Sequence, residues 1–491
     1  MQTTVRQNLP VTMRDGTVLR ADVYQPTLAG RYPVVLQRTP YDKTREGTVE
    51  HAQNIASDGY TVVLQDVRGR YASDGELKMG FFGSDHHDAE DGYDTVEWAA
   101  TLPGSNGRVG TFGSSYSGWT QWTMAHTRPP HLVTMIPGMI AANLLERELS
   151  GVLRTGRILW WSVNNLSVDT RVRSGSPGPK DRAEAERLYL ERDRDKWLWY
   201  LPLGDIPEDA LGGVVPLWRN WLQDHATDHF GFTERHREVN VPALNLTGWY
   251  DQQIGTIRHF TGMTSNGMTE HARNSQRLII GPWTHGYDFG RRVGQVDFGK
   301  AAEWDFLTIC KQWFDLWLKK DNESEAANWA PVQLFVMGAN RWRHEQEWPL
   351  PQTRYTEFYI HSGGQANTAA GDGTLSETPP ETESPDIYEY DPRDPVMTLY
   401  SPGGQQEPYD QRSLDSRKDV LVFTTSPLKS TIEVTGPVSA KIFASSSAVD
   451  TDWIIKLIDV WPNGFAQELC HGILRARYRD GFESPALLKP G

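Results

Sequence analysis

The sequence predicts an α/β protein with an all-helical insertion and a C-terminal β domain, either an antiparallel sandwich or a jelly roll. Short Val/Leu/Phe-rich runs alternate with helical patterns in the first 140 residues and again over 241–350, which indicates βαβ units and a parallel sheet. Charged helices with Leu/Trp faces replace the strands over 141–240. After about residue 350, apolar and polar residues alternate between Gly, Pro and Asn turns, a pattern typical of antiparallel β-structure.

The first part of the core has compact apolar runs of the length of buried parallel strands, and each run breaks at Pro, Gly or charge. These runs are PVVLQR (33–38), TVVLQD (61–66) and RVGTFG (108–113). Before the last of them, an acidic first turn leads into Val96, Ala99 and Ala100 at helical spacing, which predicts a crossover helix.

The strand pattern resumes after the insertion with VPALNLTG (241–248) and QRLIIG (276–281). A helix is expected over 301–320, with Trp304, Leu307, Trp313 and Trp317 as its inward stripe. In the C-terminal part, the segments TEFYIHS, STIEVTG, SAKIFASSS and DWIIKLIDVW read as strands. The predicted organisation is a core over 1–140 and 241–350, a helical cap over 141–240 and a β domain over 351–491.

Composition and charge narrow the classes of function. The formal net charge is −14 with both signs interspersed, so no basic stripe is available to meet nucleic-acid phosphates. No apolar stretch approaches the roughly 18 residues of a membrane span. Cys310 and Cys470 form no disulfide framework, and the N-terminus lacks the apolar region of a signal peptide. We therefore expect a cytoplasmic protein. The sequence leaves open whether it forms a homo-oligomer.

The stretch GTFGSSYSGWTQ (110–121) holds three serines at the expected junction between a strand and a helix. In a nucleophile elbow the residues two before and two after the serine come close together, so both must be small. Phe112 and Tyr116 exclude Ser114, and Trp119 excludes Ser117. Ser115 has Gly113 behind it and Ser117 ahead of it, and is the predicted nucleophile.

Two further loops supply the partners of a serine nucleophile in the expected chain order. Asp251 follows the strand at 241–248, and His285 follows the strand at 276–281. Ligands gather at the carboxyl ends of parallel strands in open α/β sheets. Serine needs a neutral imidazole to accept its proton, and the aspartate holds the imidazole tautomer and stabilises the imidazolium.

The tetrahedral intermediate of such a reaction needs hydrogen-bond donors for its oxyanion. One expected donor is the backbone N–H of Tyr116, and the other is the side chain of Tyr41 in the loop after the first buried strand. This chemistry requires no metal and no organic cofactor. Activity is expected to rise with pH as His285 loses its proton, at about pH 6.5 for an unperturbed histidine.

Several motifs resemble those of the CocE/NonD hydrolases, which include cocaine-esterase-like enzymes, glutaryl acylases and α-amino-acid ester hydrolases and are related to X-Pro dipeptidyl peptidases. The motifs are RTPYDKT, QDVRGRYASDGE, DGYDTVEWAA, NGRVGTFGSSYSG, LTGWYD and GPWTHG, and the likeness continues through VTGPVSAKIFASSSAVDTDWIIKLIDV. The resemblance implies an α/β-hydrolase core, a helical cap and a C-terminal jelly roll. It also implies a Ser115–Asp251–His285 triad, with an oxyanion hole formed by Tyr41 and the Tyr116 amide.

Two features depart from the family pattern. Family members usually continue for several strands beyond ESPALLKPG, so the prediction leaves open a truncated jelly roll. Gln252 and Gln253 follow Asp251 and place polar amides near the expected acyl pocket. We expect Gln253 and Trp161, the second of two adjacent tryptophans in the cap, to contact substrate.

The first hypothesis is a serine hydrolase that cleaves small carboxylic esters. An acylase or amidase with the same triad is the alternative, as is an α-amino-acid ester hydrolase with Glu146 and Glu148 around the substrate ammonium. An X-Pro dipeptidase and a catalytically silent binding protein are more distant alternatives. A metal site on His86 and His87 is disfavoured, because adjacent histidines point to different sides and lack a spaced third ligand.

Other residues near these motifs have structural explanations. Asp66, Arg68 and Arg70 are expected to form an ion-pair network that shapes the site. Trp249 and Trp283, next to the acid and base loops, are expected to support the packing.

Overall fold

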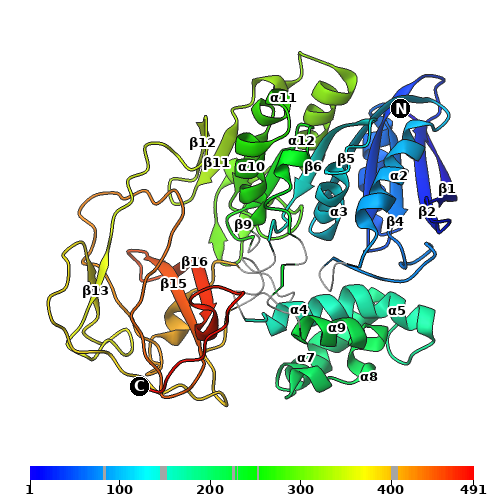
Figure 1. The fold of residues 1–491 in the computed structure, drawn as a ribbon. Coiled ribbons are helices and arrows are strands. Elements are labelled where there is room, and N and C mark those ends of the chain that lie inside the picture. Colours follow the sequence, from blue (N-terminus) through cyan, green and yellow to red (C-terminus); the bar gives the residue numbers. More distant parts are fainter. Residues whose placement is uncertain (81–84, 144–151, 224–226, 229–230, 252–253, 400–406) are drawn as a thin grey trace.

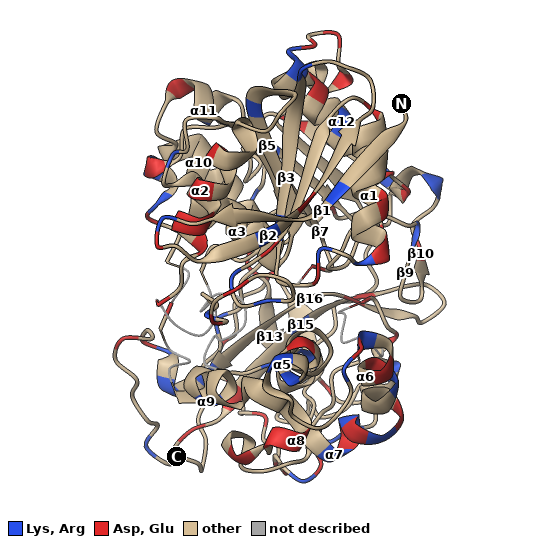
Figure 2. Cartoon of the chain, turned by 90° about the vertical axis from the view of Figure 1, so that its right-hand side faces the viewer, with Lys and Arg blue, Asp and Glu red and all other residues tan. Residues whose placement is uncertain are grey.

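The computed structural model describes residues 1–80, 85–143, 152–223, 227–228, 231–251, 254–399 and 407–491. Within them the chain forms a large α/β core, a helical cap and a C-terminal β-containing part (Figure 1). The cap lies below the core in that view, and the C-terminal part lies to its left. Both signs of charge are interspersed on the face drawn in Figure 2.

The core is built on a sheet that has ten strands over the described residues. Seven neighbouring strands in the middle run parallel, whereas β1, β2 and β12 pair antiparallel at the two ends. In spatial order the strands are β1 (Thr3–Thr12), β2 (Val18–Pro26), β4 (Thr61–Asp66), β3 (Tyr32–Thr39), β5 (Ser105–Ser114), β6 (Leu132–Gly138), β7 (Leu244–Gly248), β8 (Arg277–Gly281), β11 (Val332–Val336) and β12 (Arg341–Glu345).

Helices cover both faces of the sheet, which explains why β4 and β7 are buried throughout and β3, β5 and β6 over most of their length. Side chains of α2 (Asp88–Ala100), α3 (Tyr116–Ala125) and α10 (Gly255–Asn266) belong to one hydrophobic cluster. Those of α1 (Glu46–Ser57) and α12 (Phe306–Phe314) belong to the other. The shorter core elements are α11 (Glu270–Asn274), β9 (Arg292–Val293), β10 (Val296–Asp297), η7 (Lys300–Ala302), η8 (Asp315–Lys319) and η9 (Glu325–Asn328).

The predicted helix at 301–320 is shorter than expected, and only part of its predicted stripe is fully buried. Its buried side chains are Phe306, Ile309, Cys310, Trp313 and Phe314. Of the predicted stripe, Trp313 is fully buried, whereas Trp304, Leu307 and Trp317 are partly buried and pack against the same hydrophobic cluster. Trp304 precedes the helix, which begins at Phe306, and Trp317 lies in the π-helical turn that follows it.

The cap is all-helical in its described residues, and its apolar side chains join the same hydrophobic cluster as α3. This shared hydrophobic cluster packs the cap against the face of the core that carries α3. Its elements are α4 (Thr155–Trp161), η2 (Ser162–Leu166), α5 (Ser167–Ser174), α6 (Arg182–Leu188), η3 (Tyr189–Asp193), α7 (Arg194–Leu198), η4 (Leu203–Asp205), α8 (Glu208–Leu211), η5 (Gly212–Val214), α9 (Val215–Gln223) and η6 (His236–Glu238).

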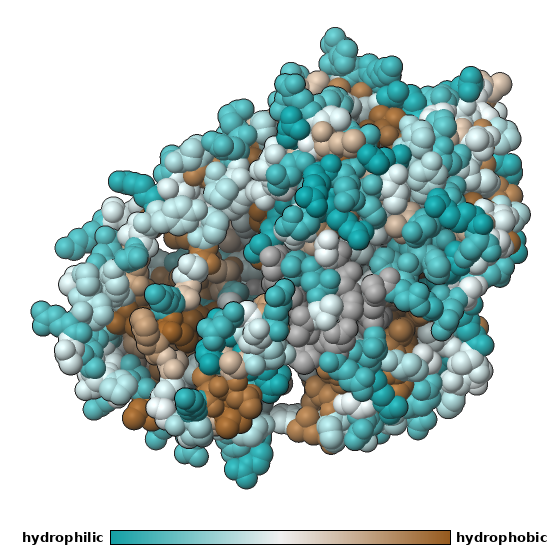
Figure 3. All heavy atoms as spheres, viewed as in Figure 1, coloured by the Kyte–Doolittle hydropathy of each residue, from teal (hydrophilic) through white to brown (hydrophobic). Residues whose placement is uncertain are grey.

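The C-terminal part contains antiparallel strand pairs, β13 (Tyr359–His361) with β14 (Thr374–Ser376) and β15 (Asp452–Val460) with β16 (Ala466–Arg475). Two short helical turns, η10 (Gln411–Leu414) and η11 (Ala476–Tyr478), accompany them. The antiparallel character is as predicted, but STIEVTG and SAKIFASSS form no strand in the structure, so the jelly-roll arrangement stays a prediction. Exposed hydrophobic residues gather over this part (Figure 3), with Phe443 94% exposed.

Candidate active site

Ser115 lies in the sharp turn between β5 and α3. Its backbone adopts φ 57° and ψ −130°, a conformation that non-glycine residues rarely occupy and that costs about 1–3 kcal/mol. The turn leaves no room for a larger residue at Gly113, where a Cβ atom would lie 2.6 Å from Ser117 Cβ. The amide of Ser115 donates to Gly138 O of the neighbouring strand β6 at 3.1 Å, which fixes the turn to the sheet.

Asp251 and His285 lie on loops that follow the neighbouring parallel strands β7 and β8. His285 Nδ1 is 3.0 Å from Asp251 Oδ1, and the Thr247 hydroxyl donates to Asp251 Oδ2 at 3.1 Å. The Asp251 side chain is fully buried. Because its carboxylate can only accept, Nδ1 carries the ring proton and Nε2 remains able to accept one.

Close approach of the two loops depends on Gly248. A Cβ atom at this position would lie 2.1 Å from Trp283 O. The amide of Trp249 donates to Gly281 O at 2.8 Å, and the amide of Tyr250 donates to Trp283 O at 3.0 Å. These bonds hold the acid loop against the base loop.

The base loop also contacts the strand beside the serine turn. The amide of Gly286 lies 2.9 Å from Met139 Sδ, directly after β6. In the sheet, Gly138 is the register partner of Ser114. The loops that carry Ser115, Asp251 and His285 therefore meet at the carboxyl edge of the parallel strands, where ligands of such sheets bind.

Tyr41 reaches Ser115 from the loop after β3. Its Oη is 3.2 Å from Ser115 Oγ, and its amide donates to Thr39 Oγ1 at 3.0 Å. The indole Nε1 of Trp161 donates to Tyr41 Oη at 3.3 Å. The structure thus brings together Tyr41, Ser115 and the cap residue Trp161.

Tyr116 is the first residue of α3, and its amide lies where the N–H groups of a helix point outward along the axis. Its side chain points elsewhere: the hydroxyl donates to Asp88 Oδ2 at 2.6 Å and accepts from Gly80 N at 2.9 Å. Burial and the Asp88 carboxylate hold the pKa of this phenol well above its usual value. Only the backbone of Tyr116 is available for the predicted role as oxyanion donor.

Asp66, at the end of β4, and Arg68 and Arg70 after it lie in ion pairs, the structural role that the sequence indicates. Asp66 pairs with Lys43 at 3.2 Å, and burial raises the pKa of the Asp66 carboxyl to about 6 although Lys43 opposes the shift. Arg68 pairs with Asp91 at 2.6 Å.

Arg70 is completely buried and joins the core to the cap. It donates to Pro40 O in the Tyr41 loop at 2.9 Å and to Asn165 O in the cap at 2.6 Å, and it pairs with Asp169 at 3.3 Å. The sequence does not reveal this connection, because nothing local indicates which cap residues fold over the core.

Two expected packing residues have that role. The indole of Trp283 is buried, stacks on Phe289 at 4.1 Å and donates to Ala302 O. Trp249 donates to Phe335 O at 2.7 Å. The expected substrate contact Gln253 lies outside the described residues, as do Gln252, Glu146 and Glu148.

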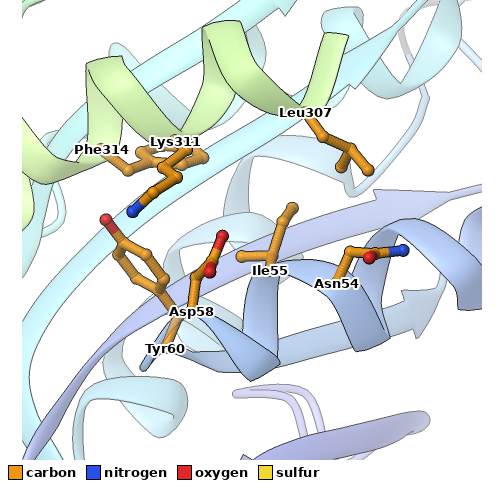
Figure 4. Close-up of a pocket in the computed structure, with 7 residues that line it drawn as sticks. All are labelled: Asn54, Ile55, Asp58, Tyr60, Leu307, Lys311 and Phe314. Atoms are coloured by element: carbon orange, nitrogen blue, oxygen red, sulfur yellow. The ribbon is translucent and has the colours of Figure 1, made fainter. Parts of the chain in front are cut away.

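Two other features of the structure are separate from this site. In the described part of the chain, no three His, Cys, Asp or Glu side chains gather in a way that could hold a metal ion. A small pocket lies between α1 and α12 (Figure 4), with Tyr60 and Lys311 among its lining residues. Tyr60 directly precedes β4, so this pocket lies at the amino end of the parallel strands, opposite to Ser115.

Comparison with known proteins settles the family. Residues 15–287 match the family model described as X-Pro dipeptidyl-peptidase (S15 family), and residues 325–491 match that of the X-Pro dipeptidyl-peptidase C-terminal non-catalytic domain. The chain belongs to the S15 family. Cocaine esterase from Rhodococcus sp. (strain MB1 Bresler) is 38% identical, with 99% of this chain and 86% of that protein covered.

Two solved structures extend the comparison. An α-amino acid ester hydrolase is 25% identical to this chain and superposes with a TM-score of 0.79. The match covers 100% of this chain and 84% of that one. A CocE/NonD family hydrolase from Staphylococcus aureus is 18% identical, with a TM-score of 0.59. The match covers 100% of this chain and 81% of that one and shows a likeness of fold. These similarities confirm the predicted family, the predicted fold class and the prediction of a serine ester hydrolase.

Proposed function

We propose that this member of the S15 family hydrolyses small carboxylic esters through an acyl-enzyme on Ser115. The observation that carries the proposal is the convergence of a strained serine turn, a buried Asp251–His285 pair and the Tyr41 hydroxyl at one sheet edge. The identity of 38% to a cocaine esterase along nearly the whole chain supports an ester as substrate.

The cycle follows from the roles of these groups. Ser115 Oγ attacks the ester carbonyl while His285 Nε2 accepts its proton, and Asp251 stabilises the resulting imidazolium. The oxyanion accepts hydrogen bonds from Tyr41 Oη and the Tyr116 amide. His285 then protonates the leaving alcohol, and a water molecule repeats the attack on the acyl-enzyme to release the acid and restore Ser115.

An α-amino-acid ester hydrolase is the second candidate, favoured by the TM-score of 0.79 to such an enzyme. The same triad serves this substrate, but the pocket must also bind an ammonium group. The rates of hydrolysis of phenylglycine methyl ester and of methyl phenylacetate, which lacks only the amine, distinguish the two candidate functions. Acylase activity on the matching amides is tested in the same way.

The described helices include none long and apolar enough to cross a bilayer. We propose the cytoplasm as the place of action, because Cys310 and Cys470 are both free thiols, as is usual in a reducing compartment.

Release of nitrophenol from p-nitrophenyl esters by three variants tests the proposal. Ser115→Ala is expected to lower kcat to the background, by up to ~10⁶-fold, and Tyr41→Phe to lower it by ~10²–10³-fold. Ser117→Ala is the matched control, because its buried Oγ has no hydrogen-bond partner among the described residues. Near-normal activity of Ser115→Ala would overturn the assignment.

A further inference from the structure

The hydroxyl that faces the nucleophile is itself contacted from the cap. Trp161 is the last residue of α4, and its indole Nε1 lies 3.3 Å from Tyr41 Oη. Tyr41 Oη in turn lies 3.2 Å from Ser115 Oγ. We propose that Trp161 is a positioning residue that orients the Tyr41 hydroxyl toward the oxyanion, an inference that rests on the proposed function.

The chemistry of the three groups decides which atom donates and which accepts in these two hydrogen bonds. An indole N–H can only donate, so Tyr41 Oη accepts from Trp161. The phenol has one proton, and it cannot point toward the indole N–H. Its rotation is thereby biased toward Ser115 Oγ, the side on which the carbonyl oxygen of a bound ester becomes negative. Acceptance of one hydrogen bond also strengthens the donation of the next.

The cap holds Trp161 at the correct distance through the helical turn that follows it. The chain continues from Trp161 as the π-helical turn η2, and such turns are frequent at functional sites. Two arginines donate hydrogen bonds to Asn165 of this turn: Arg45 to the side-chain Oδ1 at 2.9 Å and Arg70 to the backbone carbonyl at 2.6 Å.

The same two arginines hold the Tyr41 loop. Arg45 places its guanidinium over the Tyr41 ring, 5.4 Å from the centroid, and Arg70 donates to Pro40 O. The turn that carries Trp161 and the loop that carries Tyr41 are therefore held together at two points besides the indole contact. The cap thus helps to build the oxyanion hole, in addition to covering the substrate.

A positioning role and a substrate-lining role differ in their kinetic consequences. If Trp161 acts through Tyr41, its loss lowers kcat for every acyl group alike, because the oxyanion is common to all esters. If Trp161 only lined the acyl pocket, its loss would mainly change KM and would depend on the size of the acyl group.

The test is a double-mutant cycle with Trp161→Phe and Tyr41→Phe, measured on p-nitrophenyl acetate and p-nitrophenyl benzoate. We expect Trp161→Phe to lower kcat about three- to tenfold on both esters, the effect of one net hydrogen bond. In the Tyr41→Phe background the same change is expected to have no effect on kcat. Trp160→Phe is the control, because the indole N–H of Trp160 is buried with no hydrogen-bond partner in the described structure.

A second variant removes the N–H while it keeps the shape of the side chain. Replacement of Trp161 by 3-benzothienylalanine is expected to reproduce the loss of kcat seen with Trp161→Phe. An unchanged kcat in this variant, or an equal effect of Trp161→Phe with and without the Tyr41 hydroxyl, would overturn the inference. If the wild-type protein itself hydrolysed neither ester, the proposed function would fail instead.

Discussion

At Ser115 the backbone geometry is imposed by small neighbours on both sides of the turn. A Cβ atom at Gly118 would lie 2.8 Å from Gly138 O, and one at Gly113 would lie 2.6 Å from Ser117 Cβ, so neither position has room for a side chain. The strain of the turn is therefore balanced by packing and by the hydrogen bond of the Ser115 amide to β6. The serine is held, half-buried, in this conformation before any substrate binds.

Asp251 provides the first prediction. Asp251→Asn is expected to lower kcat by ~10³–10⁴-fold with little change in KM, because the amide no longer fixes the imidazole tautomer or stabilises the imidazolium. Thr247→Val is the matched comparison: it removes one hydrogen bond to the same carboxylate, so a loss of about tenfold or less is expected. Steady-state kinetics on one ester measures both, and a larger loss in the threonine variant would contradict this account.

The types of residue and their order in the chain are enough to predict the three central residues of the candidate site. Steric elimination among three serines points to the residue that occupies the strained turn, and the loops after two strands contain the aspartate and histidine that lie 3.0 Å apart. Thr247 and Arg45 are absent from that prediction. The cap partner of Arg45, Asn165, lies 120 residues away in the sequence, and no local pattern marks Thr247 as the residue that supports Asp251. Arg70 is expected in an ion-pair network, but its bonds to the cap backbone are not.

Among the elements, buried strands are the most predictable. The five expected core strands all occur, with ends that shift by a few residues, because runs of Val, Leu and Ile bounded by Gly or Pro indicate buried strands directly. The sequence pattern does not indicate the antiparallel hairpin β1–β2, because its first strand is largely exposed and polar. The four residues of the stripe expected over 301–320 all contact one hydrophobic cluster, although only Trp313 is fully buried. The division of this segment into α12 and the π-helical turn η8 is not predicted, because a regular period of 3.6 cannot anticipate a π turn.

A buried histidine pair joins the end of the cap to α10 and gives a prediction about stability. His236 Nε2 lies 2.9 Å from His259 Nδ1, and Trp122 stacks on the His259 ring at 4.1 Å. Burial lowers the pKa of His236 to about 4 and that of His259 well below its usual value, to which His236 contributes. Both rings are therefore neutral in the folded protein at neutral pH.

The sign of the pH effect follows. A histidine with a lowered pKa in the folded state stabilises the fold above the unfolded pKa of about 6.5, and this stability is lost as the pH falls toward 4. For His236 alone we expect the free energy of unfolding to fall by about 2 kcal/mol between pH 7.5 and pH 5. Urea denaturation at the two pH values measures the change.

Two variants make this prediction specific. His236→Asn is expected to be less stable at pH 7.5 but to lose less stability on acidification. His344→Gln, at an exposed histidine, is expected to leave the pH dependence unchanged. An undiminished pH dependence in His236→Asn would show that other groups cause the acid sensitivity.

At the scale of the whole molecule, the site is assembled from the core and the cap together. The cap shares a hydrophobic cluster with α3 and contacts the Tyr41 loop through Trp161, Arg45 and Arg70. Sequence patterns predict that a helical insertion exists, but not which of its side chains reach the catalytic edge. The substrate pocket is accordingly the least predictable part of the protein.

The C-terminal part contains a second serine–histidine–carboxylate set, which shows why hydrogen bonds alone do not define a nucleophile. His361 Nε2 lies 3.1 Å from Ser376 Oγ, and His361 Nδ1 lies 2.7 Å from Glu383 Oε1. Ser376 ends the short strand β14 and is followed by a bend rather than by a helix. Without the helix N-terminus and tyrosine that accompany Ser115, we expect Ser376 to remain unreactive.

Peptide mapping after treatment with a fluorophosphonate is the most direct test of the central claim that Ser115 is the nucleophile. We predict one adduct per chain, on Ser115, and none in the folded Ser115→Ala variant. An adduct on Ser376, or no adduct on the folded wild-type protein, would contradict the account.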